Sequence, residues 1–141
     1  MTADEDLPTM NEYFQQDGTI GIFVQLPHEG LLNNELDKKV HISHTTLSDR
    51  LTTGMELGLL EQTRNPDDHG NSKRYLLTKK GSKVQDMMLG LGLDDAYEQF
   101  FEAYTELETG RAKIDDWVES SHIDDPRWPP DNDPDDAQGQ F

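Results

Sequence analysis

Apolar side chains repeat with a helical period over the first half of the chain. Residues 19–25 form a short apolar run, which Pro27 should end because proline disfavours helix in the residue before it. Residues 32–40 carry an apolar side chain at every fourth position. Residues 43–57 repeat this spacing, beginning with Ser43, a residue type that caps helix N-termini well. The pattern predicts a short helix followed by two consecutive helices joined by a tight turn.

After Gly58 the helical period gives way to a strand pattern. Residues 59–63 and 73–77 are typical of two strands, and the segment between them is rich in Asn, Pro, Asp and Gly. A further helix should begin at Lys79 and end near the glycines at 90 and 92. We therefore expect a mainly α fold with a small β hairpin of two or three strands.

Residues 94–120 form the longest predicted helix, and their bulky side chains follow a heptad. One heptad position holds Tyr97, Tyr104, Arg111 and Val118, the other holds Phe100, Leu107 and Ile114, and Phe101 widens the stripe. Heptad spacing is typical of a helix that pairs with another helix. These eight positions are the expected homodimer interface, and a helix packed on its own domain is the alternative.

The chain divides into four predicted parts around one modest core. They are an N-terminal arm or short helix (1–17), a folded domain (18–93), a dimerisation helix (94–120) and an acidic tail (121–141). The tail is rich in proline and aspartate and has little apolar surface to bury, so we expect it to be disordered.

Charge is distributed unevenly along the sequence. The chain has 29 acidic and 12 basic residues and a net charge of −17, yet residues 38–83 hold nine basic and only five acidic side chains. A basic zone in an acidic body indicates a polyanionic partner. The acidic excess continues outside the tail, which we interpret as adaptation to a halophile's salt-rich cytoplasm, where screening limits the self-repulsion of carboxylates.

Several classes of protein are disfavoured by what the sequence lacks. The absence of cysteine excludes disulfides, thiolate catalysis and cysteine-ligated zinc. No phosphate-binding glycine loop or nucleophile motif occurs, so we expect no enzyme, no catalytic residues and no cofactor. His41 and His44 are separated by a turn, which makes them poor candidates for a metal site. No apolar run is long enough for a membrane span, and we expect a cytoplasmic protein.

The second of the two consecutive helices holds the residues that could read DNA. In a helix-turn-helix this helix enters the major groove N-terminus first. The candidates for base readout are His44, Thr45, Thr46, Ser48, Asp49 and Arg50. The candidates for contacts with the DNA backbone are Lys38, Lys39, Arg64, Lys73, Arg74 and Lys79. We expect Arg50 to confer sequence preference and Arg74 to contribute equally on any sequence; a solvated polar helix face is the alternative.

The order of these motifs resembles the winged-helix transcription regulators of the MarR, HxlR and PadR-like groups. The resemblance covers residues 19–91 and rests on ISHTTLSDRL, then ELGLLE, then an arginine-flanked hairpin, then RYLLTKKG. With its acidic composition the chain resembles haloarchaeal members, and that lineage's oxidative-stress regulator is one candidate for the match. The resemblance implies a winged-helix fold, double-stranded DNA as the partner, and a homodimer that reads a pseudo-palindromic operator.

The tip of the predicted wing departs from that resemblance. Family wings have basic tips, whereas this one carries Pro66, Asp67, Asp68 and His69. Either the tip stays out of the minor groove, which we favour, or bound inorganic cations bridge it to the DNA backbone. The acidic tip also leaves open a second function, a winged helix that docks another protein of the transcription machinery without reading DNA.

Overall fold

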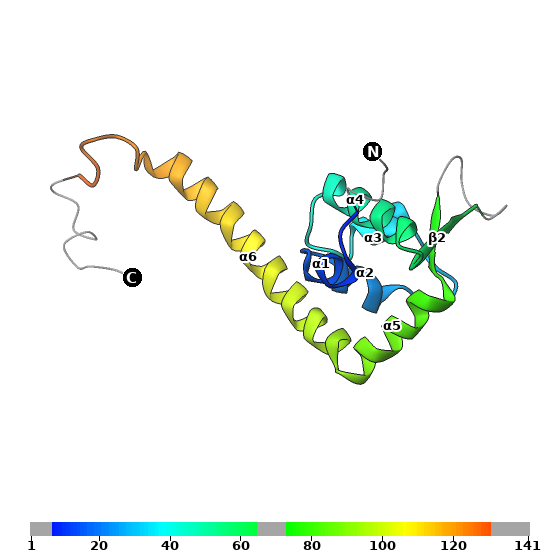
Figure 1. Cartoon of the computed structure of the whole chain (residues 1–141). Coiled ribbons are helices and arrows are strands. Elements are labelled where there is room, and N and C mark those ends of the chain that lie inside the picture. Colours follow the sequence, from blue (N-terminus) through cyan, green and yellow to red (C-terminus); the bar gives the residue numbers. More distant parts are fainter. Residues whose placement is uncertain (1–6, 65–72, 131–141) are drawn as a thin grey trace. The chain divides into compact units, whose positions relative to one another are not determined.

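Shorter helices and three short strands come first in the described chain, and one long helix follows them (Figure 1). The elements are α1 (Met10–Gln15), α2 (Thr19–Gln25), β1 (Leu31–Leu32), α3 (Asn33–Asp37), α4 (His44–Glu56), β2 (Leu60–Thr63), β3 (Arg74–Leu77), α5 (Lys79–Gly90) and α6 (Leu93–Ser121). The computed structural model describes residues 7–64 and 73–130. The chain forms two units, residues 1–102 and 103–141, and the division between them falls within α6.

The N-terminal segment is a short helix that belongs to the first unit's core. Thr9 and Glu12 form a capping box, in which the Thr9 hydroxyl accepts from the Glu12 amide at 3.1 Å and the Glu12 carboxylate accepts from the Thr9 amide at 2.8 Å. Tyr13 is fully buried. Within the predicted arm or short helix of residues 1–17, residues 10–15 are helical.

The two consecutive helices are present, but the first is shorter than the predicted 32–40. Leu31 and Leu32 pair with β3 instead, opposite Tyr75 and Arg74. The Glu35 carboxylate accepts from the Leu32 amide at 2.8 Å, so α3 begins only after this strand. The second helix, α4, begins as predicted, because the Ser43 hydroxyl accepts from the Thr46 amide at 3.1 Å.

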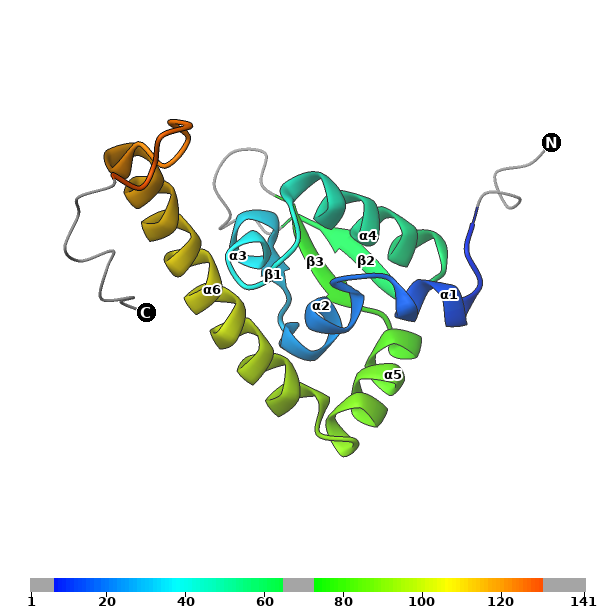
Figure 2. The ribbon, with the colours of Figure 1, turned by 90° about the vertical axis from the view of Figure 1, so that its left-hand side faces the viewer.

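The sheet has three antiparallel strands in the order β1-β3-β2, and it sets the wing beside α4 (Figure 2). In β2 and β3 the register pairs Leu60 with Leu77 and Thr63 with Arg74. The third strand is the short β1 that local periodicity assigned to a helix. The described residues therefore confirm the mainly α fold with a small wing.

The core of the first unit lies between α4, the two N-terminal helices and the sheet. Its buried side chains are Tyr13, Ile22, Phe23, Leu26, Leu36, Val40, Leu47, Leu51, Leu59, Leu60, Tyr75 and Met88. Leu47 and Leu51 lie one helical turn apart, so together they fix which face of α4 points inward and which points to solvent.

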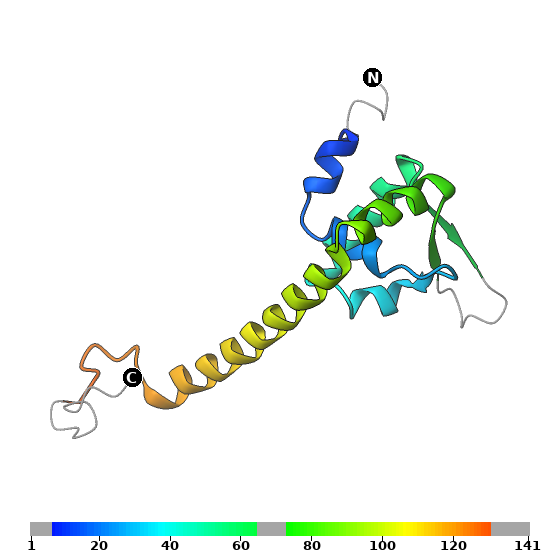
Figure 3. The same cartoon turned by 90° about the horizontal axis from the view of Figure 1, so that it is seen from below.

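In the second unit, ordered turns continue the chain after α6 (Figure 3, orange). The Trp128 ring packs edge-on against Trp117 with 5.9 Å between centroids, and Arg127 Nη2 lies 3.0 Å from an Asp125 carboxylate oxygen. Residues 122–130 of the predicted tail thus form turns in which Trp128 has aromatic surface to pack and Arg127 has a partner. Residues 131–141 lie outside the described residues. In the part described, no helix is both long and apolar enough to cross a bilayer.

Gly81 lies where the wing meets α5, and a substitution there tests how closely the two are packed. A Cβ at this position would lie 2.1 Å from the Leu59 carbonyl oxygen, which is backbone and cannot rotate away. We predict that Gly81→Ala lowers the free energy of unfolding by about 1–3 kcal/mol, measured by urea denaturation. Gly90→Ala is the matched control, since a Cβ there meets nothing within 4 Å. Alanine's higher helix propensity should leave that variant as stable as the parent or more so. Equal destabilisation by both changes would contradict the prediction.

Candidate nucleic-acid interface

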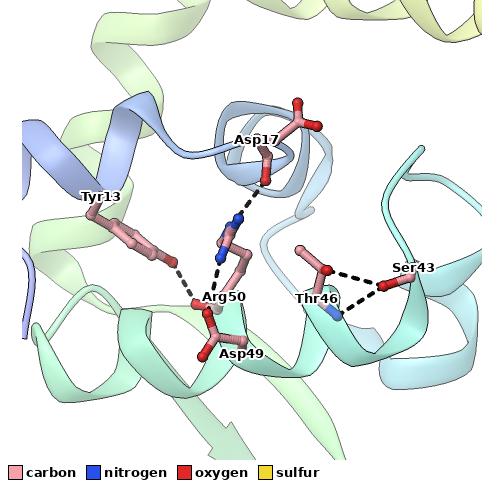
Figure 4. A network of polar contacts seen from close by, with 6 residues as sticks. All are labelled: Tyr13, Asp17, Ser43, Thr46, Asp49 and Arg50. Carbon is pink, nitrogen blue, oxygen red and sulfur yellow. Dashed lines mark hydrogen bonds and ion pairs between the residues drawn. The ribbon is translucent and has the colours of Figure 1, made fainter.

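The outward face of α4 begins with polar side chains placed by a firm N-cap. His44, Thr45 and Asp49 are exposed, and Thr46 and Ser48 are half-buried. The Ser43 hydroxyl donates to the Thr46 hydroxyl at 3.0 Å as well as accepting from its amide (Figure 4). The first turn of α4 is thereby held rigid while it presents hydroxyl and imidazole groups to solvent.

His44 also links α4 to the preceding helix. Its Nδ1 lies 3.8 Å from an Asp37 carboxylate oxygen, and both side chains are well exposed. An exposed contact at this distance stabilises little and breaks easily. His44 is therefore available to a ligand at the start of α4.

Arg50 is placed differently from the sequence-based expectation of base readout. Its side chain is only 15 % exposed. Its Nε donates to the backbone oxygen of Asp17 at 3.0 Å and its Nη1 to the Asp49 carboxylate at 2.9 Å (Figure 4). A guanidinium held in this way inside its own chain is not presented to a base edge. We therefore remove Arg50 from the base-reading set; its place at the edge of the apolar helix face gave no indication of these partners.

A buried tyrosine holds the same turn of α4 from the other side. The Tyr13 hydroxyl donates to the Arg50 carbonyl oxygen at 2.7 Å. Burial raises the pKa of Tyr13 well above its usual range, although the nearby Arg50 charge lowers it. The hydroxyl therefore stays a proton donor throughout the neutral range, and Arg50 is bound through both its side chain and its backbone.

The basic side chains predicted to contact the DNA backbone lie at four places in the first unit. Lys38 and Lys39 are exposed just after α3, and Lys79 is exposed as the first residue of α5. Arg64 and Lys73 are exposed next to the paired ends of β2 and β3. The sixth, Arg74, is half-buried and donates to the Gly30 carbonyl oxygen at 3.2 Å, so it also braces the sheet. The predicted wing tip, residues 66–69, lies outside the described residues.

The heptad residues of α6 divide into a buried group and an exposed group. Tyr97 is only 9 % exposed and its hydroxyl bonds to His41, so it belongs to the core instead of an open interface. Phe101, Tyr104 and Val118 are half-buried. Phe100, Leu107 and Ile114 are exposed by 46 %, 64 % and 59 %. Arg111 is exposed and lies 3.2 Å from a carboxylate oxygen of Glu108. The predicted dimer stripe thus begins after Tyr97.

A polar cluster that sequence reasoning missed joins three separate segments of the first unit. The His41 side chain is 10 % exposed, with Nε2 2.9 Å from the Asp17 carboxylate and Nδ1 3.2 Å from the Tyr97 hydroxyl. These residues are 24 and 56 positions from His41 in sequence, and no local pattern relates them. Within residues 7–64 and 73–130, no group of three or more acidic or histidine side chains is arranged to hold a metal ion.

Comparisons with known proteins agree on the fold. No protein-family model matches the chain, and neither does any curated protein sequence. Among solved structures, a possible HxlR family transcriptional factor from Thermoplasma volcanium matches with a TM-score of 0.51 and 19 % identity, over 75 % of this chain and 87 % of that one. The adhesin competence repressor of Streptococcus pyogenes matches with a TM-score of 0.52 and 16 % identity, over 79 % and 84 % of the two chains. The transcriptional regulator SlyA matches with the same TM-score and identity, over 78 % and 84 %. The chain therefore has the winged-helix fold, with a long C-terminal helix, that is found in these transcription regulators.

Proposed function

We propose that this protein is a sequence-specific, DNA-binding transcription regulator of a halophile, cytoplasmic and active as a homodimer on a pseudo-palindromic operator. The observation that carries the proposal is the exposed N-terminal half of α4. It is capped by Ser43, backed by buried Leu47 and Leu51, and flanked by exposed basic side chains in a chain of net charge −17. Neutral donors and acceptors on a rigid helix end suit the major groove.

Base readout in this proposal comes from side chains in the first two turns of α4. Thr45 offers a hydroxyl to base edges and a methyl group to thymine. His44 can donate or accept a hydrogen bond, and the Asp49 carboxylate can accept from a cytosine amino group while it stays paired with Arg50. Thr46 and Ser48 are half-buried, so their hydroxyls would reach only DNA groups that lie close to the helix. Specificity would rest on hydroxyl, imidazole and carboxylate groups, without an arginine fork on guanine.

Phosphate contacts would come from the exposed basic side chains around this surface. Arg64 and Lys73 flank the wing, Lys38 and Lys39 follow α3, and Lys79 begins α5. Arg74 would support the wing and leave most of the phosphate contact to Lys73. Inorganic cations could join carboxylates near this surface to the DNA backbone, since a salt-rich cytoplasm supplies them at high concentration.

Dimerisation through α6 would account for its exposed apolar stripe. Leu107 and Ile114 lie one heptad apart and both are exposed, which is costly for a helix that stays alone in water. A second copy would cover them with the same residues, as twofold interfaces do. Such a dimer would present two α4 helices about one DNA turn apart, on the order of 34 Å.

A second candidate function is a winged helix that docks another protein of the transcription machinery. One observation favours it: the exposed face of α4 includes Asp49 and Glu56, while the helix's arginine is bound internally. Two carboxylates near phosphate are repulsive at low salt. The salt experiment that follows separates the two candidates.

Binding to duplex DNA should persist at molar salt. A basic protein with six phosphate contacts loses affinity with a slope of about −5 in log K against log salt. We predict a slope much closer to zero for this chain, because salt also screens its acidic body. Fluorescence anisotropy with genomic-fragment and random duplexes, titrated to molar potassium chloride, measures the slope. Absence of binding at every salt concentration would reject DNA recognition and favour the docking module.

Two single changes should distinguish base readout from phosphate contact. Thr45→Ala removes a base-edge hydroxyl, so the preference for operator over random DNA should fall about fivefold, the worth of one net hydrogen bond. Lys73→Ala should weaken both complexes equally and shift the salt slope by about +1 relative to the parent. Operator selection from the genomic pool, followed by competition binding, measures both quantities. Identical behaviour of the two variants on operator and random DNA would contradict the assignment.

A charge inside the α6 stripe should abolish the dimer. We predict that Leu107→Asp gives a monomer in analytical ultracentrifugation, because each subunit would bury a carboxylate beside apolar side chains. Ala112→Asp introduces the same charge at an exposed position outside the heptad stripe and should leave the dimer intact. A Leu107→Asp protein of unchanged mass in solution would place the interface elsewhere.

A further inference from the structure

The turn between α1 and α2 touches two other parts of the first unit through a single residue. The Asp17 backbone oxygen accepts from Arg50 Nε at 3.0 Å, and the Asp17 carboxylate lies 2.9 Å from His41 Nε2. Gly18 follows with a left-handed φ of 88°, and a Cβ there would lie 2.5 Å from Ile42. The turn is therefore pressed against the segment that leads into α4, and it also bonds to the middle of that helix.

His41 extends these contacts to α6. Its backbone N–H lies 3.3 Å and its Nδ1 3.2 Å from the Tyr97 hydroxyl, and its ring meets Phe100 edge-on at 4.7 Å. One neutral tautomer satisfies every group: Tyr97 donates to Nδ1 and accepts from the backbone N–H, while Nε2–H donates to Asp17. Burial raises the pKa of Tyr97 to about 12, so its hydroxyl keeps its proton. In this tautomer the hydrogen bonds run from the Tyr97 hydroxyl through His41 to the Asp17 carboxylate.

The turn therefore contacts the chain just before α4, through His41, and the middle of α4, through Arg50. His41 precedes the N-cap Ser43 by two residues, and Arg50 lies one turn beyond Thr46. Both side chains are largely buried, at 10 % and 15 % exposure, whereas the Asp17 carboxylate that His41 contacts is 77 % exposed. Any shift of α6 at Tyr97 must break this chain or move the start of α4 with it.

We propose that Asp17 is a positioning residue for DNA binding: with His41 and Arg50 it forms a clamp that ties the orientation of α4 to that of α6 at Tyr97. The inference rests on the proposed function and adds a way in which DNA binding would be regulated. A ligand that moves α6 at Tyr97 changes DNA affinity through this clamp, because Tyr97 bonds to His41, and both His41 and Arg50 bond to Asp17. In this clamp Arg50 holds α4 in position and does not contact a base.

Two substitutions at Asp17 separate the clamp from a simple charge effect. Asp17→Ala and Asp17→Asn both remove one negative charge near the DNA, but only asparagine keeps a side-chain oxygen that can accept from His41. We expect Asp17→Ala to bind operator DNA about five- to tenfold more weakly than Asp17→Asn, within the usual range for coupled sites. Asp86→Ala, an exposed charge-matched change on α5, should behave like the parent. Equal affinities of the two Asp17 variants would overturn the clamp.

Hydrogen exchange measured without DNA makes the test independent of the proposed function. The amides of residues 47–54 should exchange faster in Asp17→Ala than in Asp17→Asn. Tyr97→Phe keeps the ring against Gly21 but deletes the hydroxyl that bonds to His41. Although this change lies in α6, it should also speed exchange of the amides of residues 47–54. Tyr75→Phe deletes a hydroxyl bonded to Gln62 in the wing and should leave them unchanged.

The two readouts separate failure of the clamp from failure of the proposed function. Unchanged α4 exchange in both Asp17→Ala and Tyr97→Phe would overturn the clamp even if the parent binds DNA. A parent that binds no DNA, combined with the expected exchange pattern, would reject the proposed function and leave the mechanical link standing.

Discussion

Tyr13 anchors α4 through one buried ring and one polar tip, and the arrangement of the first unit depends on it. The ring is fully buried and meets Phe14 and Phe23 edge-on at 5.2 Å and 6.1 Å. Its hydroxyl reaches the Arg50 carbonyl oxygen at 2.7 Å. Aromatic packing alone would allow α4 to slide along its axis, whereas this directional bond fixes its register. Gly54 makes the approach possible, since a Cβ there would lie 2.6 Å from the same hydroxyl.

This anchoring explains why the basic residues of the chain have two separate roles. Arg50 and Arg74 donate hydrogen bonds to the backbone oxygens of Asp17 and Gly30 inside the first unit. Arg64 and Lys73 extend into solvent beside the wing. In an acidic chain, an arginine that joins backbone oxygens adds rigidity without adding a surface cation. Under the proposed function, the exposed lysines would meet phosphate as mobile point charges.

Local patterns were sufficient for the elements whose causes are local. Ser43 and the spacing of Leu47 and Leu51 located α4, and the turn-rich segment after Thr63 located the wing. Three features were missed because their causes are distant in sequence. Leu31–Leu32 became a strand only because β3 offered an open edge, and Arg50 turned inward only because Asp17 lies beside it. Tyr97 has the heptad spacing of an interface residue, yet a close approach to Gly21 draws it into the core.

The division of α4 into a buried face and an exposed N-terminal half affects how the sequence of such a protein can evolve. Leu47, Leu51 and the Tyr13 contact hold the helix in place, and none of them lies on the exposed face. Thr45 lies on that face and adds nothing to the core, so its replacement leaves folding nearly untouched. Under the proposed function, target preference would therefore drift by single substitutions at exposed positions without an intermediate that fails to fold. Duplicated copies of this scaffold could diverge rapidly in what they recognise while keeping the same stability.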